Sequence, residues 1–398
     1  MKSLKNLYKI GHGPSSSHTM GPAKACKIML DRFKDALSFK VILYGSLALT
    51  GKGHLTDKII ELTFAPKKVE IVFDYLTYCS YHSNTLDIIA IMEDGSKHME
   101  RFYSIGGGSL EIKGGKHYLE EDIYKENNFK EIEAYCRSKN IDLVEYVIEN
   151  EGSDIYDYIE KIYNQMEETI KEGLNKEGLL PGKLLVKRKA KKILETPLKD
   201  ENLAYIRKVY AYAYATSEEN ASGGVVVTAP TCGSSGLIPS ILFAARDHYG
   251  FSKQQLMDAL LVASIFGNVV KENASISGAD AGCQAEIGVA CSMGAAAYAY
   301  LFGATTHQIE VAAEIALEHH LGLTCDPVLG YVQIPCIERN AVCSLRAINA
   351  AELAIFIDSE NKVSFDMVVE TMLETGHDLK EGYKETSLSG LAKEFVTE

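Results

Sequence analysis

The sequence predicts an α+β protein in which a small N-terminal α/β domain is followed by a large, mostly α-helical C-terminal domain. Two observations predict this order. Short β-rich runs, some with alternating apolar positions, are found in the first third of the chain. From about Leu203 onward, Ala-rich helical stretches are separated by Gly-rich loops. We place the boundary within 128–145 and assign residues 1–135 to the first domain and 136–398 to the second.

The first third carries the pattern of one helix and four strands. The helix is predicted over 24–37, with Pro22 near its first turn, where proline is tolerated. The strands are predicted at 39–44, 69–75, 86–92 and 99–104. Three successive glycines, Gly106 to Gly108, follow the last strand and predict a turn.

Helical signals dominate the remainder. Apolar residues recur at helical spacing from Ile155 to Ile170, which predicts a helix with one apolar face. Ser252 with Gln255, and Thr305 with Gln308, match the capping-box pattern and predict the starts of two later helices.

Residues 287–306 form an uncharged stretch about as long as a membrane span. The stretch is rich in Ala and Gly and includes Ser292 and two tyrosines, so we expect a closely packed buried helix rather than a span. Gly376 is predicted to end a later helix.

Composition narrows the class of partner. At 398 residues the chain is long enough for two or three domains with sizeable cores. The net charge of −13 argues against nucleic-acid and anionic-membrane partners, which need a basic face, and favours a small-molecule substrate. The nine cysteines are spread thinly and Met1–Lys5 has no signal-peptide core, so a reducing cytoplasm without disulfides is expected.

A loop with three successive serines and a histidine precedes the first predicted helix. Residues 11–22 are framed by Gly and Pro, which predicts an exposed polar loop. Ser15, Ser16 and Ser17 can offer hydroxyl and N–H groups to a carboxylate, and His18 can transfer a proton. A linker or a helix-capping turn is the alternative.

A second glycine-containing loop carries His54. It follows a predicted strand and resembles a phosphate loop only loosely, because Gly53 stands where Ser or Thr would follow Lys52. Gly51 and Gly53 permit a tight turn that would present His54 at its tip, where it can act as a general base. A surface histidine without a catalytic role is the alternative.

Two further polar loops are candidate substrate contacts. Residues 228–236 form a Gly/Ser-rich turn before a predicted helix, so Thr231, Gly233 and Ser234 can bind a carboxylate. A simple helix cap is the alternative. Asn273 and Ser275 lie in 271–280, a polar stretch that leads to Cys283 and can contact an amino acid or support a metal centre.

Three cysteines in the last third are candidate metal ligands. Cys325 and Cys336 lie in Gly- and Pro-rich loop sequence, and Cys283 follows a glycine. Three thiolates suit an iron–sulfur cluster that leaves one iron open. Their separations of 42 and 11 residues match neither a zinc ribbon nor a ferredoxin run. From spacing alone, buried free thiols remain the alternative.

Five motifs in order resemble the iron–sulfur L-serine dehydratases of bacteria, in the single-chain arrangement with the β-type domain first. The resemblance runs from about residue 7 to the tail Lys384-Glu-Thr-Ser387. The motifs are Gly13-Pro-Ser-Ser-Ser-His-Thr19, Tyr44-Gly-Ser-Leu-Ala-Leu-Thr-Gly-Lys-Gly-His54, Lys271-Glu-Asn-Ala-Ser-Ile-Ser-Gly278, Gly322-Leu-Thr-Cys-Asp-Pro327 and Ile334-Pro-Cys-Ile-Glu-Arg-Asn340.

This resemblance implies a [4Fe–4S] cluster held by Cys283, Cys325 and Cys336, and the conversion of L-serine to pyruvate and ammonia. An open iron would act as a Lewis acid on the serine hydroxyl. His54 would be the base and His18 a substrate or relay group, although the order can be reversed. The serine loop and the loop from Thr231 to Ser234 would hold the substrate. A homodimer is also expected.

The chain departs from the family pattern at two places. Cys232 stands where relatives usually have Asn, which puts an amide contact there in doubt and places a thiol near the predicted site, where it can bind iron. Some relatives end in a cysteine that reaches the cluster, whereas this chain ends Phe395-Val-Thr-Glu398, so that self-inhibition is expected to be absent.

Three alternative functions remain open from the sequence. A pyridoxal-phosphate dehydratase would need a Schiff-base lysine, for which Lys271 is available. A related cluster lyase would act on L-threonine or L-cysteine, which a comparison of kcat/KM among substrates distinguishes. A non-catalytic amino-acid-binding protein would show no anaerobic turnover of L-serine.

Overall fold

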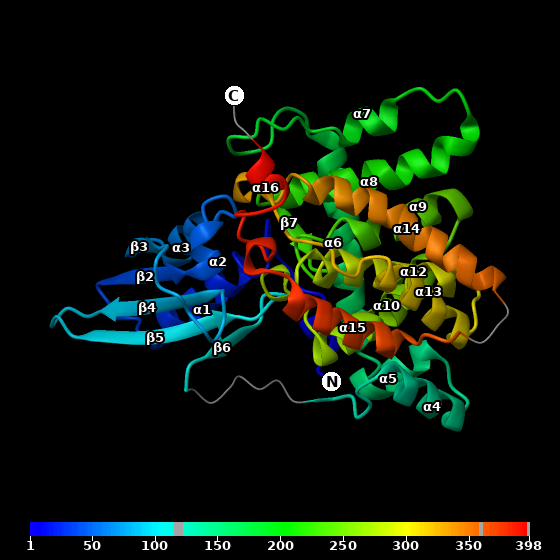
Figure 1. Cartoon of the computed structure of the whole chain (residues 1–398), viewed down its shortest axis with the longest axis horizontal. Helices are drawn as coiled ribbons and strands as arrows, with labels where there is room; N and C mark the ends of the chain where they lie inside the picture. The colour runs from blue at the N-terminus through cyan, green and yellow to red at the C-terminus, as the bar shows by residue number, and fades with distance from the viewer. Residues whose placement is uncertain (115–121, 358–360, 396–398) are drawn as a thin grey trace.

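The computed structural model describes residues 1–114, 122–357 and 361–395 and contains a sheet domain beside a larger helical body. Figure 1 shows the sheet domain in blue and cyan at the left and the helical body at the right. The α+β prediction and its order, a small α/β part first, are therefore confirmed. The boundary between residues 135 and 136 stays a prediction.

The sheet domain is built on a five-stranded sheet of order β3-β2-β4-β5-β6. Strands β2 and β3 pair in parallel, with Ser38 of β2 opposite Lys68 of β3. The other pairs of neighbouring strands are antiparallel. The elements of this domain are α1 (Met20–Arg32), β2 (Ser38–Tyr44), α2 (Gly45–Leu49), α3 (Thr56–Phe64), β3 (Lys68–Asp74), β4 (Thr85–Ile91), β5 (Lys97–Ser104) and β6 (Leu110–Ile112).

Alternation along β2 explains its place in the sheet. Phe39, Val41 and Leu43 are buried and the residues between them are partly exposed, as expected for a strand with one face on a core. These side chains pack with α1 and α3 in a small apolar core of the sheet domain. All four predicted strands are present within a few residues, and the predicted helix begins at Met20, earlier than expected.

The helical body surrounds α12, whose side chains are almost all buried and which packs against α10, α13 and α14. Its elements are α4 (Phe129–Lys139), α5 (Leu143–Glu151), α6 (Ile155–Asn175), α7 (Ala190–Glu195), α8 (Ala204–Ala221), β7 (Val225–Val227), α9 (Leu237–Tyr249), α10 (Lys253–Asn273), α11 (Gly278–Ala281), α12 (Ile287–Leu301), α13 (Thr306–Glu318), α14 (Cys336–Phe356), α15 (Phe365–Asp378) and α16 (Leu391–Glu394). Short 3-10 turns lie at Leu4–Asn6, Glu201–Leu203, Cys283–Ala285, Val328–Gly330 and Glu381–Tyr383.

The helices of the helical body test several of the sequence predictions. Both capping boxes, at Ser252 and Thr305, are confirmed. Among the described residues, none of the helices has the length and apolarity needed to cross a membrane, and 287–306 contains the buried helix α12. The stop at Gly376 is wrong, because α15 continues to Asp378. The glycine serves packing instead: a Cβ at Gly376 would lie 2.8 Å from the Cβ of Ala281.

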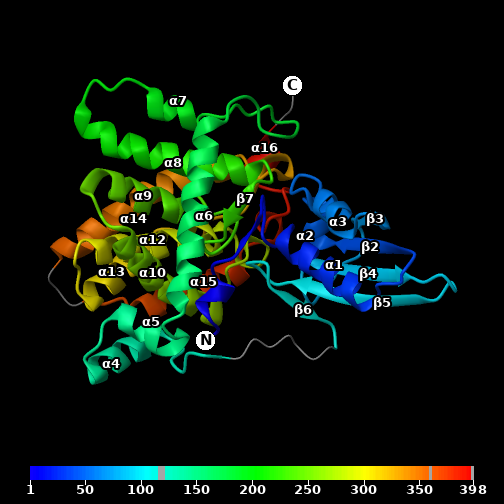
Figure 2. The same ribbon diagram turned by 180° about the vertical axis from the view of Figure 1, so that it is seen from behind.

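Both ends of the chain cross between the two parts. The first residues pack in the core of the helical body, where the Tyr8 hydroxyl donates to Leu260 O at 3.0 Å. The strand β1 (Ile10–His12) then pairs antiparallel with β7. At the other end, Figures 1 and 2 show the red segment after α15 at the junction of the two parts. The candidate site lies at this junction.

Candidate active site

His18 lies in the serine loop and is fully buried. Its Nε2 lies 2.9 Å from Thr50 Oγ1 and 3.2 Å from Ser46 O. A carbonyl only accepts, and Thr50 Oγ1 already donates to Ser46 O at 2.9 Å, so Nε2 carries the proton of a neutral ring. Nδ1 then accepts from Ser15 Oγ or Ser17 Oγ, at 3.2 and 3.1 Å.

His54 stacks on His18, with ring centroids 4.3 Å apart and the planes 23° apart. Its Nδ1 lies 3.0 Å from Thr50 O and therefore donates to that carbonyl. The expectation of exposed loops is wrong for both histidines. The His54 loop is buried because Gly53 packs against the backbone of Gly330 in the helical body, so the two domains close over it.

Glu385 completes this cluster and was not predicted from the sequence. It follows α15 in the C-terminal segment and is 4% exposed. Its carboxylate Oε1 lies 3.3 Å from His54 Nε2, 3.7 Å from His18 Nδ1 and 3.4 Å from Ser15 Oγ. The motif Lys384-Glu-Thr-Ser387 was recognised within the resemblance, but nothing in it indicated which residues it would meet.

Three hydrogen bonds to backbone carbonyls hold the segment around Glu385 in place. Its N–H donates to Cys325 O at 2.9 Å, and Cys325 N–H donates to Tyr383 O at 2.8 Å. Ser46 Oγ donates to Glu385 O at 2.8 Å. Glu385 also adopts a left-handed φ of 56°, which is uncommon for a residue with a side chain. The segment is thereby fixed to both domains.

Burial and mutual charge shift the pKa values of this cluster. The pKa of His18 falls to about 4, chiefly through burial and then through His54, against the opposing charge of Glu385. Burial acts to raise the pKa of Glu385, but the charges of His18 and His54 outweigh it and hold that pKa below its usual value. At neutral pH His18 is therefore a neutral ring beside a carboxylate.

The three predicted metal-ligand cysteines come together from separate segments. Cys283 precedes α12, Cys325 follows α13, and Cys336 begins α14. Burial raises the pKa of the Cys336 thiol, and the nearby thiol of Cys283 adds to the effect. Cys325 is likewise affected by both of the other thiols, so all three lie within electrostatic reach of one another.

Two neighbours shape the space around these thiols. Arg339 hydrogen-bonds the Cys283 thiol and opposes the rise in its pKa that burial causes. Gly278 leaves room, since a Cβ there would lie 3.1 Å from Cys325 Sγ and 2.8 Å from Glu286 Oε2. Three converging thiols with an adjacent cation fit the donor set of an iron–sulfur cluster, whose anionic charge a guanidinium can offset.

The predicted anion loop already faces a carboxylate of the chain. Thr231 Oγ1 donates to Glu286 Oε1 at 2.7 Å, and Ser234 Oγ donates to Ala229 O at 3.1 Å. Gly233 lies close to the same carboxylate, because a Cβ there would be 3.3 Å from Glu286 Oε1. Burial, followed by the charge of Glu385, raises the pKa of Glu286 to about 8. Glu286 was also missed by the sequence.

The remaining substrate candidates are placed differently. Ser16 is buried within the serine loop, and Ser275 Oγ accepts from Ser277 N–H at 3.1 Å. Asn273 is exposed at the end of α10, where its amide donates to Asn127 O at 2.6 Å and Val269 O at 2.8 Å. The structure therefore does not bring Asn273 to the cluster of His18, His54 and Glu385.

Two residues with alternative roles, Cys232 and Lys271, make contacts with other segments. Cys232 is buried with its Sγ 3.6 Å from Met20 Sδ, and burial raises the pKa of its thiol. Lys271 Nζ donates to Asn6 O at 2.9 Å. That contact ties it to the N-terminal segment, which does not favour a Schiff-base role.

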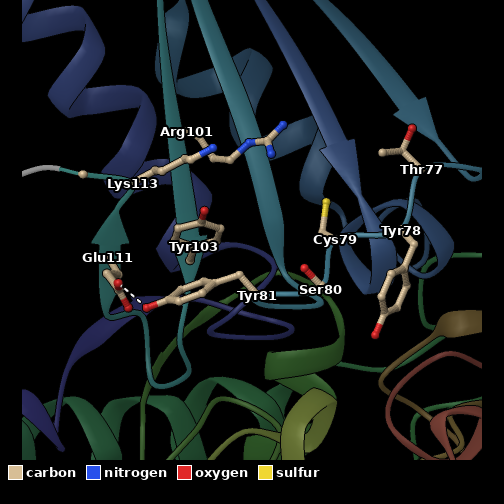
Figure 3. Close-up of a pocket in the computed structure, with 10 residues that line it drawn as sticks. Thr77, Tyr78, Cys79, Ser80, Tyr81, Arg101, Tyr103, Glu111 and Lys113 are labelled. Carbon is tan, nitrogen blue, oxygen red and sulfur yellow. Dashed lines mark hydrogen bonds between the residues drawn. The ribbon is translucent and has the colours of Figure 1, made fainter.

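A cavity of about 310 Å³ adjoins the buried cluster. Its walls include Ser46 and Thr386, the neighbours of His18 and Glu385, and the loop from Tyr75 to Ser83. A more exposed cavity of about 500 Å³ shares residues 77–81 of this loop. Figure 3 shows Arg101 and Lys113 on one side of the exposed cavity and the hydrogen-bonded pair Tyr81 and Glu111 on the other. None of the predicted site residues lines it, so the first cavity is the better route to the site.

Comparison with known proteins gives matches along the chain. The family model described as serine dehydratase beta chain matches residues 3–70, and the model described as serine dehydratase alpha chain matches residues 84–392. L-serine dehydratase 2 of Escherichia coli is 39% identical, with 100% of this chain and 99% of the relative covered. An L-serine dehydratase of Haemophilus influenzae is 38% identical, with 100% of this chain and 100% of the relative covered. An L-serine dehydratase of Helicobacter pylori is 42% identical, with 98% of this chain and 98% of the relative covered.

Proposed function

Because the chain belongs to the serine dehydratase family, we propose that it is an L-serine ammonia-lyase whose [4Fe–4S] cluster is held by Cys283, Cys325 and Cys336. One observation supports the cluster most: three thiols from separate segments converge beside the buried histidines and Glu385. The curated relatives named above are L-serine dehydratases, which supports the substrate.

The open iron of such a cluster supplies a Lewis acid that makes the substrate hydroxyl a better leaving group. The protein must then remove the α-proton of L-serine. His54 is the better base, because its Nε2 has no hydrogen-bond partner while its Nδ1 is held by Thr50 O. Both nitrogens of His18 are engaged, so we assign it to orienting the stacked ring and the substrate.

The overall chemistry needs only this one protein base. His54 Nε2 takes the α-proton, the Cα–H electron pair forms the carbon–carbon double bond, and the Cβ–O bond breaks to release hydroxide. The imidazolium of His54 then returns its proton to the hydroxide, which leaves as water and regenerates the neutral base. The enamine product tautomerises and hydrolyses to pyruvate and ammonia. Glu385, 3.3 Å from Nε2, stabilises the imidazolium that the proton transfer creates.

Substrate binding follows from the polar walls of the site. The hydroxyls of Ser15, Ser17 and Thr231 can bind the carboxylate, and the carboxylates of Glu286 and Glu385 suit the ammonium group. A bound ammonium would also favour the ionised form of Glu286, whose pKa is raised by burial and by the charge of Glu385. The homodimer and the cytoplasmic location remain proposals.

Anaerobic purification tests the cluster directly. Iron, sulfide and L-serine turnover would be measured for the parent and for Cys283→Ala, Cys325→Ala and Cys336→Ala, with Cys26→Ala as a matched buried control from the sheet domain. We expect each of the three variants to lose most of its iron and its turnover, and the control to keep both. Full iron, sulfide and turnover in all three variants would overturn the proposal.

A further inference from the structure

Two ring nitrogens and one carboxylate oxygen converge between the domains. His54 Nε2 is buried and has no hydrogen-bond partner, yet it lies 3.3 Å from Glu385 Oε1. His18 Nδ1 lies 3.7 Å from the same oxygen. The three ligand atoms all lie within 4.8 Å of one another. Lone pairs this close repel unless a proton or a metal cation lies among them.

The opposite nitrogens fix which lone pairs point inward. His54 Nδ1–H donates to Thr50 O at 3.0 Å, so in the neutral ring the lone pair is on Nε2, on the inner side. His18 Nε2–H is directed at Thr50 Oγ1 and Ser46 O, which leaves the Nδ1 lone pair on the inner side. The hydroxyls of Ser15 and Ser17 lie 3.2 and 3.1 Å from this nitrogen and would turn away when a metal binds it. Histidines that bind metals have this arrangement, with the second N–H held by a carbonyl or similar acceptor.

The two nitrogen–oxygen distances are close to those around a tetrahedral zinc ion. Zinc lies about 2.0–2.2 Å from imidazole nitrogen and carboxylate oxygen, so two ligands at a tetrahedral angle are about 3.3–3.6 Å apart. The 3.3 Å between His54 Nε2 and Glu385 Oε1 falls in that range. The 3.7 Å from His18 Nδ1 is slightly wide and would need to close by about 0.3 Å.

We propose that His18, His54 and Glu385 form a binding site for Zn²⁺, distinct from the three cysteine thiols. Ser15 Oγ, 3.2 Å from His18 Nδ1 and 3.4 Å from Glu385 Oε1, or a water molecule completes the coordination. The ion enters through the cavity of about 310 Å³ whose wall includes Ser46 and Thr386. The ligands are two imidazole nitrogens and one carboxylate oxygen, with no thiolate among them. The site therefore selects metals that prefer nitrogen and oxygen coordination.

The inference has a functional consequence that rests on the proposed function. Zinc would occupy the lone pair of His54 Nε2 that removes the α-proton. Zinc is therefore a reversible inhibitor that competes with L-serine, and a chelator restores turnover. Zinc binding does not depend on the proposed reaction, so zinc binding and L-serine turnover can be tested separately.

Zinc binding would be measured by calorimetry on the anaerobic, cluster-loaded full chain, in which the cysteines are already engaged. One equivalent is expected to bind. His54→Gln and Glu385→Gln should each weaken binding about 100-fold or more, because each removes a ligand. The control His319→Gln alters an exposed histidine that donates to Ile315 O and should bind like the parent. Unchanged affinity in both ligand variants would overturn the site.

Zinc-edge X-ray absorption of the parent chain provides a test that needs no variant to fold. The expected spectrum has imidazole scattering and only nitrogen and oxygen ligands at about 2.0–2.2 Å. A sulfur shell at about 2.3 Å, or no bound zinc at all, would refute the site even if L-serine turnover is intact. Conversely, zinc bound through imidazole in a chain without serine turnover would uphold the site and refute the proposed function.

Discussion

Replacing Gly53 by Ala tests whether the contact between the domains positions His54. Gly53 precedes the proposed base and packs against the helical body. A Cβ at this position would lie 2.3 Å from Gly330 O and 2.6 Å from Gly330 C. Both are backbone atoms, so no side chain can rotate away. The two segments must separate instead, and His54 moves with its neighbour.

The size of the effect follows from the overlap. Relief to an ordinary contact of about 3.4 Å requires a displacement of about 1 Å, and a misplacement of that size costs roughly 100-fold in rate. A 100-fold loss in kcat/KM corresponds to about 2.7 kcal/mol of transition-state stabilisation. The loss should fall mainly on kcat, because the serine and threonine hydroxyls that line the site are on other segments.

Steady-state turnover of L-serine by the anaerobic Gly53→Ala variant would measure this loss, with iron content and circular dichroism confirming an intact fold. Gly95→Ala is the control. Gly95 lies in the turn between β4 and β5, has a φ of 84° and would meet no atom within 4 Å. That control should lose about 1 kcal/mol of stability and no activity. A folded, iron-loaded Gly53→Ala enzyme with kcat/KM near the parent's would refute the reasoning.

Two further predictions concern charge and proton transfer. His54→Asn should lower kcat by about 100-fold or more while iron content stays that of the parent, and His18→Asn should lower it less; equal losses would argue against His54 as the base. Glu218 is buried, accepts from Lys189 N–H at 2.6 Å, and has its pKa raised by burial from 4.5 to about 7. Since the folded state then holds the proton more tightly than the unfolded state, stability should fall as pH rises from about 4.5 to 7, by about 3 kcal/mol in all. Glu218→Gln should flatten this dependence in urea unfolding, and an unchanged slope would contradict the assignment.

Short-range pattern was sufficient for most elements. The alternation of Phe39, Val41 and Leu43 predicts a strand, because successive side chains of a strand point to opposite faces. The side chains of Ser252 and Gln255 form their capping box within one helical turn. His18, His54 and the three cysteines were singled out as candidates from their own neighbourhoods, and their roles came from the family resemblance and stay predictions. The family matches support the reaction.

Long-range convergence could not be found in this way. Glu385 reaches the histidines only because the tail pairs with Cys325, and a motif of four residues carries no sign of that partner. Burial of the loops was missed for a related reason. Gly and Ser predict an exposed loop within one domain, whereas here a second domain covers it. Asn273 shows the converse, since a polar residue near Cys283 in sequence ends a helix and turns outward.

The two crossing ends of the chain set an order for its synthesis. The strand β1 leaves the ribosome first but pairs with β7, which is made after the whole sheet domain. Glu385 is made after both histidines and all three cysteines. A nascent chain can fold its sheet early, because those contacts are local, yet the histidines meet Glu385 only after the segment that carries it has been made. A product truncated before Glu385 would therefore carry both histidines and all three thiols without the complete candidate site.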